Sequence, residues 1–67
     1  MRIDGYKLKE IRERMNVTRA ELALIADLTH ARIWQLETEP VSNVNANVGK
    51  ALARKLKCKT EDIEVRP

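Results

Sequence analysis

The chain has 67 residues, a length that allows one small domain rather than several. Thirteen Lys and Arg residues against ten Asp and Glu residues give a formal net charge of +3, so the protein is mildly basic. The single Cys58 excludes an internal disulfide, and no cluster of His and Cys has the spacing of metal ligands. No apolar run is long enough for a secretion signal or a membrane span. We therefore expect a cytoplasmic protein that uses no metal, cofactor or small-molecule substrate.

The positive charge is concentrated at the two ends of the sequence. Residues 1–19 contain six basic and three acidic residues, and residues 50–67 contain the same numbers. Residues 20–49 contain one basic residue, Arg32, against four acidic residues, which gives this segment a net charge of −3. The middle of the chain therefore lacks the cations with which proteins neutralise DNA phosphates.

The spacing of apolar residues predicts a first helix over about residues 5–15. Asp4 is a suitable N-cap for it, because a carboxylate can accept hydrogen bonds from the free amides of the first turn. Asn16 tolerates left-handed backbone and is expected to end the helix. Three apolar residues recur at three- and four-residue steps and are expected on the inner face: Leu8, Ile11 and Met15.

Two further helices joined by a short turn are predicted over about residues 18–37. Thr18 and Glu21 form a capping box, in which each side chain can bind the backbone amide of the other residue. The first of these helices should end near Ala26, the turn should hold Asp27, and Thr29 should cap the second helix. The inner faces are expected to carry Leu22, Ile25, Ala26, Ile33 and Leu36, with the small Ala23 where the helices cross.

Pro40 should stop the third helix, and a polar segment follows it. A fourth helix is predicted over about residues 45–57, and Thr60 is expected to cap a short fifth turn that buries Ile63. No alternation of apolar and polar residues predicts a strand. The expected fold is therefore an all-α, compact five-helix domain over residues 1–67. One apolar stripe is expected along the fourth helix: Val44, Val48, Leu52 and Leu56.

Three segments together resemble the Cro/CI-type, XRE-like helix-turn-helix family of lambda-repressor-like domains. Residues 18–23 resemble the start of the first motif helix, residues 29–37 the recognition helix, and residues 52–63 the closing helices. The resemblance covers about residues 7–64. It implies a phage or prophage type of transcription regulator, without enzymatic activity, that binds operator DNA as a symmetric dimer with its recognition helix in the major groove.

The resemblance also implies which residues contact double-stranded DNA. Gln35 matches a base-contacting position, where its amide can bind adenine with two hydrogen bonds, and Ala31 matches another, where its methyl can contact thymine. Arg19 stands where the family often has a phosphate-binding Gln, and Arg can bind phosphate with charge added. Arg12 and Glu37 match a pair that the family joins by an internal salt bridge. The predicted DNA-binding set is Arg19, Thr29, His30, Ala31, Arg32, Trp34 and Gln35.

The segment after the recognition helix supports an alternative interpretation. Residues 38–43 contain Glu39 and no cation, whereas the family often has basic residues there. A free monomer is therefore expected to bind DNA weakly. Trp34 is unusual on a groove-reading face and is a residue type enriched in protein interfaces. The alternative is an anti-repressor or modulator of the same fold that binds a heterologous repressor through Trp34, Glu39, Val41 and Val44.

A third interpretation is the antitoxin of a toxin–antitoxin pair, although the chain lacks the toxin-binding extension that such proteins often carry.

The remaining apolar residues are expected either to pack in the core or to lie on the surface. Cys58 occupies an apolar position of the family and is expected to be a buried thiol. Met1 and Ile3 are free to add to an exposed apolar patch on the side where the family often dimerises.

Overall fold

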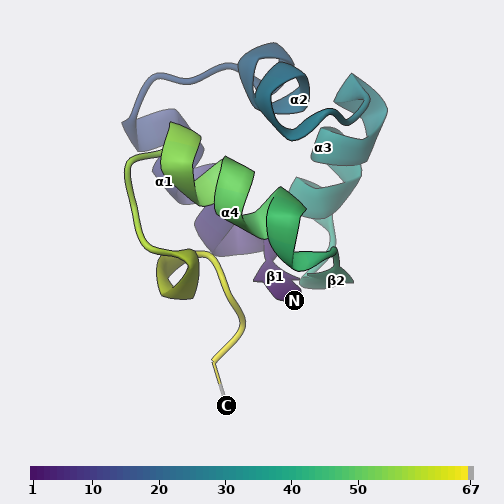
Figure 1. Ribbon diagram of the computed structural model, residues 1–67, viewed down its shortest axis with the longest axis vertical. Helices are drawn as coiled ribbons and strands as arrows, with labels where there is room; N and C mark the ends of the chain where they lie inside the picture. The colour runs from purple at the N-terminus through teal and green to yellow at the C-terminus, as the bar shows by residue number, and fades with distance from the viewer. Residues whose placement is uncertain (67) are drawn as a thin grey trace.

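A computed structural model describes residues 1–66 and contains four α-helices, two short strands and one 3-10 turn (Figure 1). In chain order these elements are β1 (Arg2–Asp4), α1 (Gly5–Arg14), α2 (Arg19–Ala26), α3 (His30–Thr38), β2 (Val41–Asn43), α4 (Ala46–Lys55) and η1 (Thr60–Asp62). The helix-turn-helix fold predicted from the sequence is confirmed. The fifth predicted helix is only the 3-10 turn η1, and its N-cap residue is Lys59 rather than Thr60.

Local hydrogen bonds explain where the helices begin and end. Each α-helix starts at a side chain that accepts from the amide three residues further on, at 3.0–3.1 Å, and such a cap is worth about 1 kcal/mol. The four capping residues are Asp4, Thr18, Thr29 and Asn45. Asn16 and Asp27 have left-handed backbone after α1 and α2, with φ of 57° and 56°, as their side chains allow. These boundaries agree closely with the predicted ones.

The core lies between the helices, and α2 packs against both α3 and α4. Two inner-face predictions are wrong. Met15 is 40% exposed because α1 ends at Arg14 and the chain turns away. Ile25 is 52% exposed because α2 buries Leu22 and the alanines beside it, which leaves position 25 at the edge of the buried stripe. The buried apolar residues are Ile3, Leu8, Leu22, Ala23, Ala26, Ile33, Leu36, Leu52, Ala53, Leu56 and Ile63.

A two-stranded antiparallel sheet beside the N-terminus was not predicted (Figure 1). Strand β1 pairs with β2 so that Ile3 lies opposite Ser42. The pairing continues past the strands, where the Met1 amine donates to the Val44 carbonyl and the Val44 amide donates to the Met1 carbonyl, each at 2.9 Å. Ile3 is fully buried, so the expectation that it is free on the surface is wrong. The sheet holds the segment after α3 in a fixed position.

Gly5 explains how closely this segment approaches α1. A Cβ atom at position 5 would lie 2.2 Å from the Glu39 carbonyl oxygen and 2.4 Å from the Leu36 carbonyl oxygen. The Gly5 amide also donates to the Pro40 carbonyl at 3.3 Å. The end of α3 therefore rests against the start of α1 at a point where only glycine fits. None of the helices within residues 1–66 is both long enough and apolar enough to span a membrane.

Candidate nucleic-acid interface

The helix-turn-helix is formed by α2, a left-handed turn and α3. Asp27 occupies the turn with φ 56° and ψ 45°, and the Leu28 amide after it donates to the Ala23 carbonyl at 2.9 Å. Ala23 itself is only 7% exposed, and a small side chain at this position lets α2 and α3 pack closely. The predicted roles of Ala23 and Asp27 in the motif are both consistent with this geometry.

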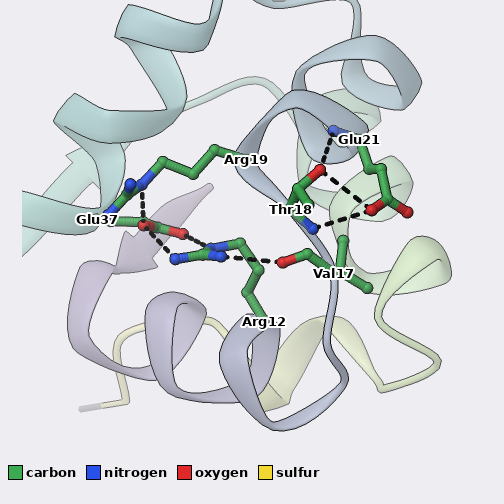
Figure 2. Close-up of polar contacts among 6 residues, drawn as sticks. All are labelled: Arg12, Val17, Thr18, Arg19, Glu21 and Glu37. Carbon is green, nitrogen blue, oxygen red and sulfur yellow. Dashed lines mark hydrogen bonds and ion pairs between the residues drawn. The ribbon is translucent and has the colours of Figure 1, made fainter.

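One buried carboxylate ties three helices together (Figure 2). The Glu37 side chain on α3 is fully buried and accepts from two nitrogens of the Arg12 guanidinium on α1. Arg12 also donates to the Val17 carbonyl at 2.9 Å, which holds the loop before α2. The salt bridge that the family resemblance implies is therefore present. It fixes α3 relative to α1, and so fixes the surface that α3 presents.

Arg19 joins the same cluster (Figure 2). Its Nε atom donates to Glu37 at 2.9 Å, and about a third of its side chain is exposed (32%). Within residues 1–66 its two terminal nitrogens make no hydrogen bond. Arg19 is thus held at the N-terminus of α2 with donors still available. Phosphate binding by Arg19 remains a prediction, and it need not require the pair with Glu37 to break.

The outer face of α3 is largely free of core contacts. Thr29 at its N-cap is exposed and uses its hydroxyl to accept from the Arg32 amide at 3.0 Å. Arg32 is half-buried. The exposed side chains of the face are His30, Ala31, Trp34 and Gln35. All four belong to the predicted DNA-binding set, and the fold brings them together on one surface.

A hydrogen-bonded ring that the sequence analysis missed runs across this face. Arg32 donates to the Gln35 side-chain oxygen at 2.9 Å and to the Asn43 carbonyl on β2 at 3.1 Å. Gln35 donates from Nε2 to Glu39 at 3.1 Å, and the Ser42 hydroxyl donates to the other Glu39 oxygen at 3.2 Å. Positions 32, 35 and 39 follow helical spacing, which was the available sequence signal. The involvement of β2 required the strand pairing to be known.

The four residues of the alternative partner interface lie in different environments. Trp34 is 55% exposed and Val41 is 40% exposed, on α3 and β2 respectively. Glu39 is exposed but belongs to the ring on α3. Val44 is half-buried and packs against the core. An interface made by all four remains a prediction, and Val44 has the least surface to offer it.

No group of three or more His, Cys, Asp or Glu side chains within residues 1–66 is placed to hold a metal ion. Cys58 is half-buried rather than buried, and it packs against the core. Burial raises the pKa of the Cys58 thiol, and the nearby Asp62 carboxylate raises it further. The thiol therefore stays protonated at neutral pH and behaves as an apolar side chain.

Two short helices, a left-handed turn and an exposed second helix define a helix-turn-helix protein. The chain belongs to the helix-turn-helix family, whose model matches residues 8–63. Membership in this family supports a DNA-binding transcription regulator, a class of protein that is generally not enzymatic.

Among solved structures, the chain is similar to the restriction-modification controller protein C.AhdI from Aeromonas hydrophila. The TM-score is 0.74 at 22% sequence identity, and the match covers 87% of this chain and 86% of that chain. The two proteins therefore share a fold. No relative is found among curated protein sequences.

Proposed function

We propose that this protein is a small transcription regulator of the phage or prophage type, which binds operator DNA in the bacterial cytoplasm with α3 in the major groove. The observation that carries the proposal is the two-sided character of α3. Its inner residues Ile33 and Leu36 are fully buried, whereas His30, Trp34 and Gln35 are exposed and have no role in the core. A helix held firmly on one face, with side chains such as Gln35 free on the other, is suited to reading base edges.

Specific contacts would come from α3 and positioning contacts from α2. The Gln35 amide offers a donor and an acceptor to adenine, and the Ala31 methyl suits thymine. The terminal nitrogens of Arg19 would bind a phosphate beside the N-terminus of α2, where backbone amides also favour an anion. These contacts carry no enzymatic chemistry, so regulation would follow from occupancy of the operator.

A dimer would supply affinity that one copy lacks. The domain measures 29 × 20 × 20 Å, so a single copy covers roughly one half-site. Two copies related by a two-fold axis would place two α3 helices in successive major grooves about 34 Å apart. We therefore expect a palindromic operator and cooperative binding of two copies.

Fluorescence anisotropy with duplexes from the promoter of the protein's own locus tests this function. Gln35→Ala should relax preference at one base position, whereas Arg19→Ala should weaken binding to all sequences alike. Asn47→Ala, which truncates an exposed amide on α4, is the matched control and should change neither. Normal operator binding by both the Gln35 and Arg19 variants would exclude this docking.

A modulator of a second repressor is the other candidate function. The observation in its favour is the exposed Trp34, because a large aromatic side chain on a surface is typical of a protein interface. The same anisotropy assay, repeated with the product of the adjacent gene, separates the two functions. Binding only in the presence of that product, or loss of that product's own DNA binding, would favour the modulator.

A further inference from the structure

The ring of hydrogen bonds on the outer face of α3 fixes the direction in which Gln35 presents its amide. We propose that Glu39 is a positioning residue for base recognition: it orients the Gln35 amide so that α3 selects adenine and rejects guanine. This inference rests on the proposed DNA-binding function. It assigns a role in specificity to a carboxylate that does not itself bind DNA.

The chemistry of the two partners permits one orientation of the amide. A carboxylate accepts hydrogen bonds and cannot donate, so the Gln35 Nε2 must face Glu39, as it does at 3.1 Å. A guanidinium donates and cannot accept, so the Gln35 Oε1 must face Arg32, as it does at 2.9 Å. In a flipped amide, Gln35 Oε1 would face the Glu39 carboxylate, acceptor against acceptor, and Nε2 would face the Arg32 guanidinium, donor against donor.

Both partners are themselves held by β2. The second Glu39 oxygen accepts from the hydroxyl of Ser42, a residue that is only 5% exposed. Arg32 donates to the backbone carbonyl of Asn43, the next residue of the same strand. Since β2 is paired with β1, the two residues that orient Gln35 are anchored on the sheet. The free protein therefore already holds the Gln35 amide in this orientation.

The capacity that remains on Gln35 matches adenine. After the two internal hydrogen bonds, the amide keeps one N–H on Nε2 and one lone pair on Oε1. Adenine offers an acceptor at N7 and a donor at N6, which pair with these two groups. Guanine offers acceptors at both N7 and O6. With the amide held in place, Gln35 Oε1 would face guanine O6, and these two acceptors would repel each other. A bidentate contact of this kind discriminates between bases by roughly 5- to 150-fold.

Glu39 is expected to increase specificity, but its negative charge should lower the affinity for DNA. A carboxylate near the DNA surface repels phosphates, so its removal should strengthen binding to DNA of any sequence by roughly twofold to fivefold at low salt. Loss of Glu39 should therefore raise general affinity and lower specificity together. A merely structural residue would change the affinity for all sequences in one direction and leave their ratio unaltered.

The test measures the dissociation constants of the full chain for duplexes that carry A or G at the position where Gln35→Ala loses preference. Glu39→Ala should reduce the A-to-G preference at least fivefold while raising affinity for unrelated DNA. Glu39→Gln removes the charge but keeps an acceptor for Nε2, so it should retain most of the preference. Glu13→Gln, which neutralises an exposed carboxylate on α1, is the control and should keep the preference of the original protein.

A double variant shows whether Glu39 acts through Gln35. In a Gln35→Ala background, Glu39→Ala should have no further effect on the A-to-G ratio, while its effect on general affinity should persist. An unchanged ratio in Glu39→Ala, or an equal loss of preference without Gln35, would overturn the positioning role alone. Absence of sequence preference in the original protein would overturn the proposed function and this inference together. Thermal melting of each variant checks that it remains folded.

Discussion

Replacement of Glu37 by Gln should remove much of the stability of the domain. Glu37 is the fully buried partner of Arg12, whose side chain is only 9% exposed, and Gln has nearly the same shape but no charge. The variant leaves the Arg12 guanidinium buried without a counter-charge, which costs about 3–5 kcal/mol. A domain of 67 residues has a total stability of roughly 3–10 kcal/mol, so the loss is a large share of it.

Thermal unfolding followed by circular dichroism measures this effect. At roughly 4–8 °C per kcal/mol for a domain of this size, the melting temperature should fall by at least about 12 °C. Glu10→Gln is the control, because Glu10 pairs with Arg14 at 3.4 Å on the surface, and exposed pairs of this kind contribute about 0.5 kcal/mol or less. A loss below about 1 kcal/mol for Glu37→Gln would refute the reasoning.

A double replacement separates the pair from the burial of one charge. Arg12→Met with Glu37→Met removes both buried charges and fills a similar volume, which is often neutral for stability. Arg19 would lose its partner as well, but it is partly exposed and can be solvated by water. The double variant should therefore be clearly more stable than Glu37→Gln. Equal instability of the two variants would show that the hydrogen-bond geometry, rather than an uncompensated charge, decides the cost.

Three further predictions concern the backbone and the caps. Gly5→Ala should destabilise the fold by about 2 kcal/mol or more in urea unfolding, since its Cβ would meet two backbone carbonyls; Gly49→Ala is the control, because there the Cβ meets only the flexible Met1 side chain. Asp27→Gly should raise the melting temperature, since glycine relieves a left-handed backbone that costs roughly 1 kcal/mol; a lower melting temperature would contradict this. Thr18→Ala should cost about 1 kcal/mol at neutral pH. In addition, the Thr18 backbone amide and hydroxyl both donate to the Glu21 carboxylate and lower its pKa; the stabilisation from these two bonds is present above the ordinary pKa of that carboxyl and is lost as the pH falls through its lowered value, and Thr18→Ala removes the hydroxyl bond alone. A pH titration of stability should therefore show a smaller acid loss in Thr18→Ala than in the original protein.

Local features of the fold could be predicted from the sequence because they depend on neighbours in the chain. The caps at Asp4 and Thr18 act over three residues, and the left-handed turn at Asp27 depends on the side chain at that position alone. The strands could not be predicted in this way. Each has three residues, too few for an alternating pattern, and the partners Ile3 and Ser42 lie 39 positions apart in the sequence. Pairing of this kind is decided by the packing of the whole domain.

The candidate site likewise has local parts, which could be predicted from the sequence, and parts that depend on distant residues, which could not. The exposed face of α3 follows from helical spacing, which placed Trp34 and Gln35 outward. The spacing of Arg32, Gln35 and Glu39 also indicates one face, so their hydrogen bonds could have been anticipated. The anchor on Asn43 depends on β2 and could not. Glu39 therefore looked in the sequence like a feature of a partner interface, whereas the fold connects it to the predicted base-reading residue.

The folded structure also changes the meaning of the charge count for residues 20–49. Of the four acidic residues behind the net charge of −3, Glu37 is buried against two arginines, and Glu21 lies 3.6 Å from the Lys55 amine. Cations from the flanking segments thus compensate two of the four carboxylates, so repulsion between a monomer and DNA should be weaker than the sequence count implies. Of the remaining two, Glu39 is the one bonded to Gln35 on the predicted base-reading face of α3. Under the proposed function, the electrostatic cost of DNA binding would therefore include the carboxylate that we propose orients Gln35, and the Glu39 variants measure this exchange of affinity for specificity.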